Sequence, residues 1–238
     1  MVINPNALGL DLPPGTVRVQ PSYWYANEPA THDTWSRLLP AREAAGLQPV
    51  LLTETQHLSA SQRGDADDRD VSATLAELWA YVQEDEEPEY GDEPWPGLAA
   101  PGEPTADPDA QAAELAAELA TDDKHFKGAH AALVPARRSA DIVTALGWGG
   151  ASNHTDAVQL ATVLRSWEDR FGIRVVGLGP DFMSVSVAAP PRTREHALAV
   201  AAEHHAFCPD NVWQGAGSLE EYAAEAVLGQ TEWWFWWD

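Results

Sequence analysis

The chain has 238 residues, of which 45% are hydrophobic and 21% are charged, so it is long enough for a sizeable core and is not disordered in composition. Its formal net charge of -23 disfavours nucleic acid and anionic membrane surfaces as partners, because both would be repelled. A basic protein partner fits this charge, and so does a simple role in solubility.

The sequence also predicts the compartment. Cys208 is the single cysteine, which excludes an intramolecular disulfide. The first residues, MVINPNALGLDLPPG, lack the basic start and apolar run of a signal peptide. No apolar run approaches the roughly 20 residues of a membrane helix. We therefore expect a reducing, cytoplasmic location.

Residues 1–82 are predicted to form a small α/β region. Residues 17–25 have the character of a strand, with Tyr23 and Tyr25 on one face and Trp24 on the other. The remaining predicted elements are a helix over 31–46 that Pro40 breaks or kinks, a buried strand over 48–55 and an amphipathic helix over 70–83.

Residues 83–123 differ in composition, because they are rich in acidic residues and proline and contain no basic residue. Such a segment buries too little apolar surface to offset its ordering entropy. We expect residues 84–108 to be a solvated linker or long loop. An alanine-rich helix is predicted over 108–123, with Leu115 and Leu119 on one face.

Residues 129–238 carry the strongest patterns. The clearest is the helix over 155–172, which has a buried stripe and Gly172 as its C-terminal stop. The other predicted elements are a strand over 129–136, a short helix over 139–146, a glycine-rich turn over 147–153, strands over 173–179 and 182–190, and helices over 193–208 and 218–229.

A final strand, TEWWFWWD, completes the order β-α-β-β-α-(α)-β, which resembles a ferredoxin-like α+β sandwich. In strand geometry Trp233, Phe235 and Trp237 share one face, while Trp234, Trp236 and Asp238 share the other. We expect a core strand buried on both faces. The alternative is an aromatic platform for a ligand.

Several phrases of this region resemble a known family. They are LGWGGASN, LRSWEDRFGIRVVGLG, VAAPPRTREHALAVAAEHHAFCPDNVWQG and WFWWD. They occur in order at the spacing of the DUF4253 family, a bacterial domain of unknown function, and the resemblance covers roughly residues 129–238. It implies a compact domain and no particular activity, and residues before it look like a variable lead-in.

Residues 201–215 contain the most suggestive side chains for catalysis. His204 and Cys208 are four residues apart on one helix face, which suits an activated thiol or half of a zinc site. The alternative is that Cys208 is a small buried hydrophobe. Asp210 suits a general base, a cation ligand or a turn residue. No Cys/His pair supplies further ligands, so we predict neither metal nor cofactor.

Ligand-binding candidates lie in four places. The turn around Trp148 is either an anion cradle or a tight turn. Arg192 and Arg194 begin a helix, where the dipole disfavours cations, so a bound anion would explain them, as would plain exposure. Gln214 and Asp238 are the other two ligand-binding candidates. The two carboxylates of Asp238 would need arginine partners if buried, and the candidates are Arg165, Arg170 and Arg174.

Two functions remain open from these residues. The first is a non-enzymatic binding or regulatory protein that acts through protein–protein contacts and neutralises a basic partner, such as a toxin. The second is an enzyme with a cleft between the N-terminal region and the C-terminal sandwich. Its predicted catalytic residues are His204, Cys208, Asp210 and Asn153.

Overall fold

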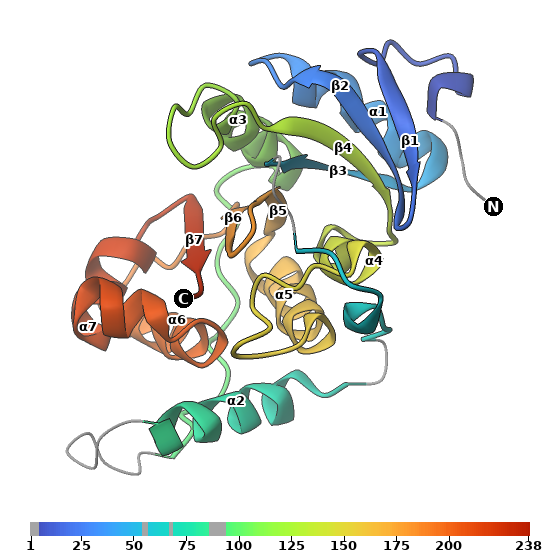
Figure 1. Ribbon diagram of the computed structural model, residues 1–238. Coiled ribbons are helices and arrows are strands. Elements are labelled where there is room, and N and C mark those ends of the chain that lie inside the picture. Colours follow the sequence, from blue (N-terminus) through green and yellow to red (C-terminus); the bar gives the residue numbers. More distant parts are fainter. Residues whose placement is uncertain (1–4, 54–56, 67–68, 86–93) are drawn as a thin grey trace.

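Strands from both halves of the chain join in one mixed sheet in the computed structural model, which describes residues 5–53, 57–66, 69–85 and 94–238. The sheet has seven strands in the order β1-β2-β4-β3-β5-β6-β7 (Figure 1). Neighbouring strands are antiparallel except β3 and β5, which are parallel. The strands are β1 (Gly15–Val19), β2 (Ser22–Pro29), β3 (Leu47–Leu52), β4 (His130–Pro135), β5 (Arg174–Leu178), β6 (Phe182–Ser186) and β7 (Glu232–Trp236).

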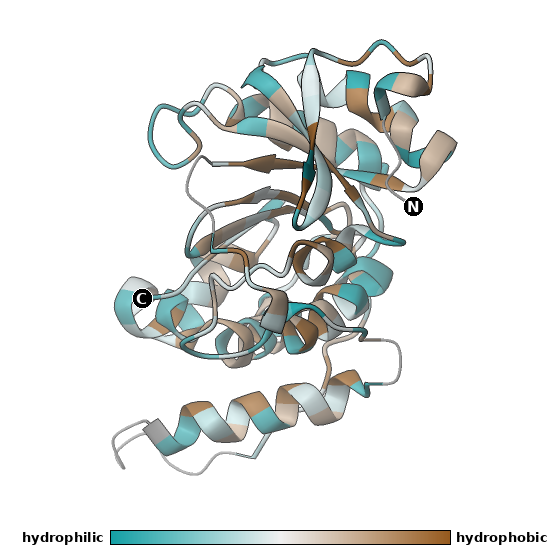
Figure 2. Ribbon diagram, turned by 45° about the vertical axis from the view of Figure 1, so that its right-hand side comes forward, coloured by the Kyte–Doolittle hydropathy of each residue, from teal (hydrophilic) through white to brown (hydrophobic). Residues whose placement is uncertain are grey.

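Helices cover both faces of this sheet, and Figure 2 shows apolar strands enclosed between them. The α-helices are α1 (Thr34–Ala45), α2 (Val71–Asp85), α3 (Pro108–Leu119), α4 (Ile142–Leu146), α5 (Ala157–Phe171), α6 (Arg194–Phe207) and α7 (Leu219–Tyr222). Short 3-10 turns span Pro5–Ala7, Ala60–Gln62 and Ser139–Asp141, and π-helical segments span Asn211–Ala216 and Ala223–Val227.

The two faces have separate cores. Helices α1 and α3 pack on one face around Trp24, Trp35 and Phe126. Helices α4, α5 and α6 pack on the other face around Trp148 and Trp167. Helix α2 contacts α5 and α6 and so forms an outer layer, farthest from the sheet in Figure 1. Among the residues described, no helix combines the length and apolar character that crossing a membrane requires.

The mixed α/β class and the order of elements in the C-terminal half are confirmed. The ferredoxin-like strand pairing is not observed, because β3 of the N-terminal half lies between β4 and β5, and β7 pairs with β6 at an edge. All six residues of β3 are buried. A strand that is apolar on both faces requires cover on both, which places it in the interior of the sheet.

One local prediction also changes. The strand predicted over 17–25 is a hairpin, in which Gln20 and Pro21 join β1 to β2. Pro21 has no N–H to donate to a neighbouring strand and favours a turn at this position. The faces were predicted correctly, since Trp24 is buried and Tyr23 and Tyr25 lie on the other side.

The predicted solvated linker, residues 84–108, falls partly outside the described residues, because 86–93 are not described. Residues 94–107 form a loop without helix or strand, and most of them are exposed, but the loop is anchored to the protein at Ala99. The Ala99 N–H donates to Glu203 Oε1 at 2.7 Å, and Arg170 Nη2 donates to Glu203 Oε2 at 2.6 Å. Glu203 is fully buried, and a buried carboxylate requires hydrogen-bond donors. Its bond from the Ala99 N–H therefore holds this segment against α5 and α6.

Candidate functional site

The outer edge of β7 is bonded by side chains where a further strand would otherwise pair. Asn211 Nδ2 donates to the Trp234 carbonyl at 2.6 Å, and the Trp236 N–H donates to Asn211 Oδ1 at 3.3 Å. The Cys208 thiol donates to the Trp236 carbonyl at 2.9 Å. An edge strand with unpaired backbone groups invites unwanted pairing, and Asn211 and Cys208 prevent it here.

A chain of hydrogen bonds continues behind this edge. Asn211 Nδ2 also donates to the Tyr222 hydroxyl at 3.0 Å. The Tyr222 hydroxyl in turn lies within hydrogen-bond distance of His204 Nδ1, 3.1 Å away. His204 is neutral, and its buried Nε2 makes no hydrogen bond to the described residues. Its ring lies 4.4 Å from that of Trp233, and burial together with nearby Arg170 holds its pKa well below the usual value.

Cys208 lies at the end of α6 with no exposed surface. Burial raises the pKa of its thiol well above the ordinary value, and the thiol donates its proton to a carbonyl. A nucleophile has to be an accessible thiolate, so these surroundings do not suit catalysis. The interpretation of Cys208 as a small buried group fits them, with the thiol as a structural donor.

The other catalytic candidates form a surface chain. Asp210 Oδ2 accepts from the Asp238 N–H at 3.0 Å, and Asp210 Oδ1 accepts from Gln214 Nε2 at 2.9 Å. Asn153 Nδ2 donates to the Asp238 carbonyl. Asp210 thus organises a turn and the end of the chain. No group of three His, Cys, Asp or Glu side chains in the described ranges could hold a metal ion.

The glycine-rich turn encloses Trp148 rather than leaving room for an anion. Trp148 is fully buried, and its indole N–H donates to the Gly179 carbonyl at 2.8 Å. A Cβ at Gly150 would lie 2.1 Å from the Trp148 ring, so glycine is needed there for this close approach. Arg192 and Arg194 are both exposed, which agrees with the alternative of plain exposure to solvent.

The expected partners of Asp238 are engaged elsewhere. Arg165 Nε donates to Asp141 at 2.5 Å and Arg174 Nε to Asp109 at 2.8 Å, while Arg170 pairs with buried Glu203. Asp238 itself is exposed, so water solvates its charge and no arginine is required. The arginine partner was expected only for a buried Asp238, so that condition does not apply.

The terminal strand is buried on one face only. Trp233, Phe235 and Trp237 are buried, as predicted for that face. Trp234 and Trp236 are half-buried, so the expectation of burial on both faces is wrong. The physical reason is the edge position of β7, where, among the described elements, only the two π-helical segments flank Trp234 and Trp236.

Those two indoles line a pocket of about 350 Å³ at the outer face of β7. The Trp234 ring is held by stacking on Phe182, with ring centroids 4.9 Å apart. The two π-helical segments form the rest of the wall, and such segments often occur at functional sites. The lining residues are Asn211, Gly215, Ala216, Tyr222, Glu225, Ala226, Gln230, Glu232, Trp234 and Trp236.

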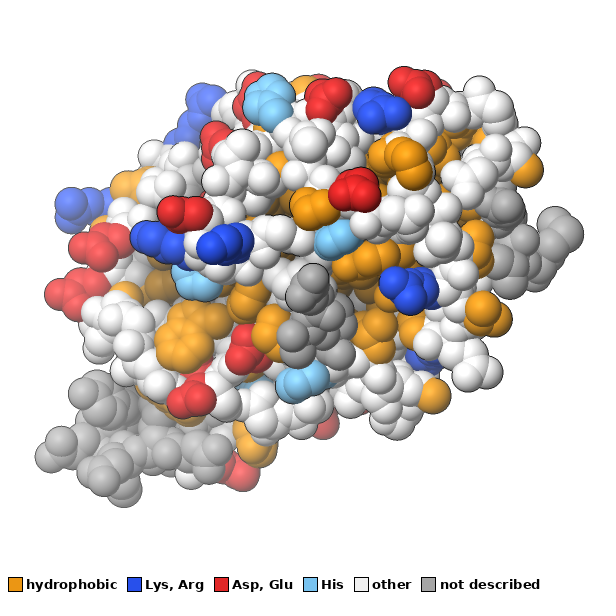
Figure 3. Space-filling view, turned by 45° about the horizontal axis from the view of Figure 1, so that its top comes forward, with side chains coloured by type: hydrophobic (Ala, Val, Ile, Leu, Met, Phe, Trp, Pro, Cys, Tyr) orange, Lys and Arg blue, Asp and Glu red, His pale blue; other side chains and the backbone are white. Residues whose placement is uncertain are grey.

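The charged side chains that line this pocket, among the described residues, are acidic. Its described lining includes Glu225 and Glu232 but no Lys, Arg or His. Burial raises the pKa of Glu232, and Glu118 and Asp122 raise it further, although a 2.6 Å hydrogen bond from Ser184 opposes the shift. On the face seen in Figure 3, by contrast, acidic and basic side chains are interspersed.

The residues that build this pocket were not recognised from the sequence, apart from the aromatic terminus. Asn211 follows Asp210 in the sequence and was not itself a candidate, and Glu225 and Glu232 resemble ordinary surface charges in the sequence. One signal was present: the alternation in TEWWFWWD leaves two tryptophans on the second face, which suits the platform alternative.

Comparison with known proteins supports the resemblance seen in the sequence. Residues 130–238 match the family model described as "Domain of unknown function (DUF4253)". No curated protein and no solved structure matches the chain. The pocket at β7 lies entirely within the matched residues, and the strands β1, β2 and β3 lie outside them.

Proposed function

We propose, taking residues 130–238 as a DUF4253 domain, that the protein is a non-enzymatic binding module whose pocket at β7 takes a cationic side chain of a basic protein partner. The observation that carries the proposal is the combination of Trp234 and Trp236 with Glu225 and Glu232 in one pocket without a basic lining residue. Aromatic faces attract cations through their ring quadrupole, and carboxylates supply the counter-charge.

Two further features support this function. The net charge of -23 accelerates encounter with a basic partner and disfavours acidic competitors. The buried thiol of Cys208 argues against the alternative of a cysteine enzyme, because its hydrogen bonds serve the β7 edge. A free cysteine also fits the reducing, cytoplasmic compartment that forms part of the proposal.

The experiment compares N-acetyl-arginine amide with its citrulline counterpart, which has nearly the same shape without the charge. Isothermal titration should detect saturable binding of the arginine compound and much weaker binding of citrulline. Glu232→Gln keeps a partner for Ser184 but removes the charge, and Trp236→Leu removes an indole. Each variant should weaken binding by about tenfold.

The matched control is Glu220→Gln, since Glu220 lies on α7 outside this pocket. A decrease of the same size in Glu220→Gln would mean that only the overall charge attracts the cation. Equal binding of arginine and citrulline compounds, or no saturable binding, would contradict the proposal. Melting temperatures of all variants establish that the fold is retained.

A further inference from the structure

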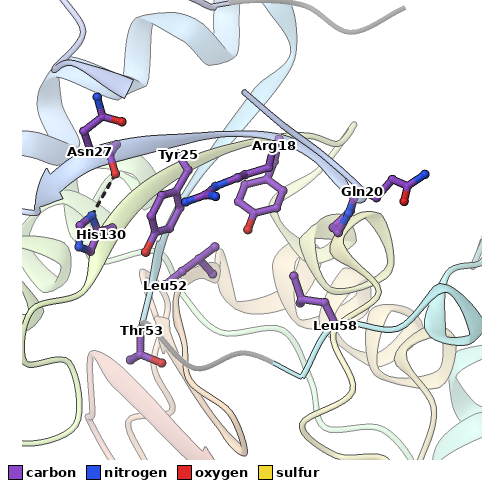
Figure 4. Close-up of a pocket in the computed structure, with 11 residues that line it drawn as sticks. Arg18, Gln20, Tyr25, Asn27, Leu52, Thr53, Leu58 and His130 are labelled. Carbon is purple, nitrogen blue, oxygen red and sulfur yellow. Dashed lines mark hydrogen bonds between the residues drawn. The ribbon is translucent and has the colours of Figure 1, made fainter. Parts of the chain in front are cut away.

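A second, larger pocket lies on the N-terminal half of the sheet, away from the pocket at β7. Its volume is about 630 Å³, which is in the range of small-molecule sites. Figure 4 shows side chains from β1, β2, β3 and β4 converging on it. The opposite face of these strands carries Trp24 and Ala26, which belong to the core under α1 and α3.

The centre of this pocket is Tyr25, which lies between two nitrogen-bearing side chains. The Arg18 guanidinium carbon is 5.2 Å from the centre of the Tyr25 ring. The His130 ring stacks on Tyr25 with centroids 5.0 Å apart and an interplanar angle of 13°. Strand β2 lies between β1 and β4, so Arg18 and His130 approach Tyr25 from opposite sides (Figure 4).

The imidazole is oriented by the backbone. His130 Nδ1 lies 3.0 Å from the Ala26 carbonyl, which can only accept, so Nδ1 carries a proton. Tyr23 adds a hydroxyl donor beside Arg18, and burial raises the pKa of Tyr23 so that it keeps its proton. The Arg18 guanidinium and the Tyr23 hydroxyl are therefore donors in this pocket that suit an anion.

The local charge of this pocket is opposite to that of the protein. The described lining residues include Arg18 and His130 but no Asp or Glu, in a chain of net charge -23. Leu52 and Leu58 supply an apolar wall. The chain leaves β3 at Leu52, where β3 and β5 run parallel, and ligands in open α/β sheets bind beyond such carboxyl ends.

We propose that this pocket binds a small organic anion, in which a carboxylate or phosphate is held by Arg18 and an apolar body packs against Tyr23 and the leucines. The apolar wall accounts for the body of the ligand, and the guanidinium accounts for the anionic group. This site is separate from the pocket at β7 and does not depend on the function proposed for it.

The test uses benzoate and phenyl phosphate as probes and benzylamine as the cationic counterpart. Isothermal titration should give saturable binding of at least one anion to the full chain, and the ratio of the two affinities identifies carboxylate or phosphate as the preferred group. Arg18→Gln should weaken that binding by about tenfold or more. Amide resonances of β1, β2 and β4 should shift on titration.

Arg192→Gln is the matched control, because it removes the same charge from an exposed position outside this pocket. Equal losses in Arg18→Gln and Arg192→Gln, equal binding of benzylamine, or no saturable binding of either anion would overturn the proposal. Trp236→Leu should leave anion binding unchanged, so failure of this site is distinguishable from failure of the pocket at β7. Unchanged melting temperatures exclude unfolding as the cause.

Discussion

Replacing Asn211 by alanine tests whether one side chain secures the edge of the sheet. Asn211 makes three hydrogen bonds: to the Trp234 carbonyl at 2.6 Å, to Tyr222 at 3.0 Å and from the Trp236 N–H at 3.3 Å. Two are short and one is long. With about 1 kcal/mol for each short bond, less for the long one, and a penalty for the buried groups left unpaired, Asn211→Ala should cost about 2–4 kcal/mol.

Urea denaturation gives this free energy directly, and a thermal melt should show a decrease of roughly 5–15 °C for a chain of this size. Gln214→Ala is the control on the same π-helical segment. Gln214 is exposed and its side chain bonds only to Asp210 in the described residues, so its loss should cost less than about 0.5 kcal/mol. A melting temperature of Asn211→Ala within about 1 °C of the parent would refute the reasoning.

Three further predictions concern buried groups of α6. The pKa of His204 is depressed in the folded protein, so below about pH 6.5 the unfolded chain binds a proton at His204 that the folded chain does not, and stability is lost as pH falls. His204→Asn should reduce this dependence of the unfolding free energy on pH between about pH 7 and 5 in urea melts. Cys208 should react with iodoacetamide only as fast as the protein unfolds, and rapid labelling in native buffer would contradict its burial. Glu203→Gln leaves the Arg170 charge without its buried partner and should destabilise the fold by about 3 kcal/mol, whereas an unchanged urea midpoint would show the ion pair to be dispensable.

Local patterns predicted the elements of this protein well, because helices and caps depend on neighbouring residues. Helix α5 begins after Asp156, whose side chain caps two N–H groups, and ends at Gly172 with a φ of 61°. Its predicted stripe, from Leu160 to Phe171, is buried. The alternation of the last residues likewise assigned the side chains of β7 to its two faces, although only the face of Trp233, Phe235 and Trp237 is buried.

Pairing between distant segments was decided only by the tertiary structure. Nothing near β3 in the sequence indicates that it separates β4 from β5, because strand pairing depends on residues far along the chain. The same holds for Glu203, which anchors Ala99 from 104 residues away, and for Arg18, which meets His130 around Tyr25.

In the candidate sites, too, some properties follow from the sequence alone and others only from the tertiary structure. The sequence by itself determined the charge, the single cysteine and the aromatic terminus, because these are properties of composition and local order. Whether Cys208 is reactive and whether Trp236 lines a pocket depend on burial and on partners brought from other elements. These properties exist only once the sheet has assembled, because desolvation and hydrogen-bond geometry are set by the packed neighbours.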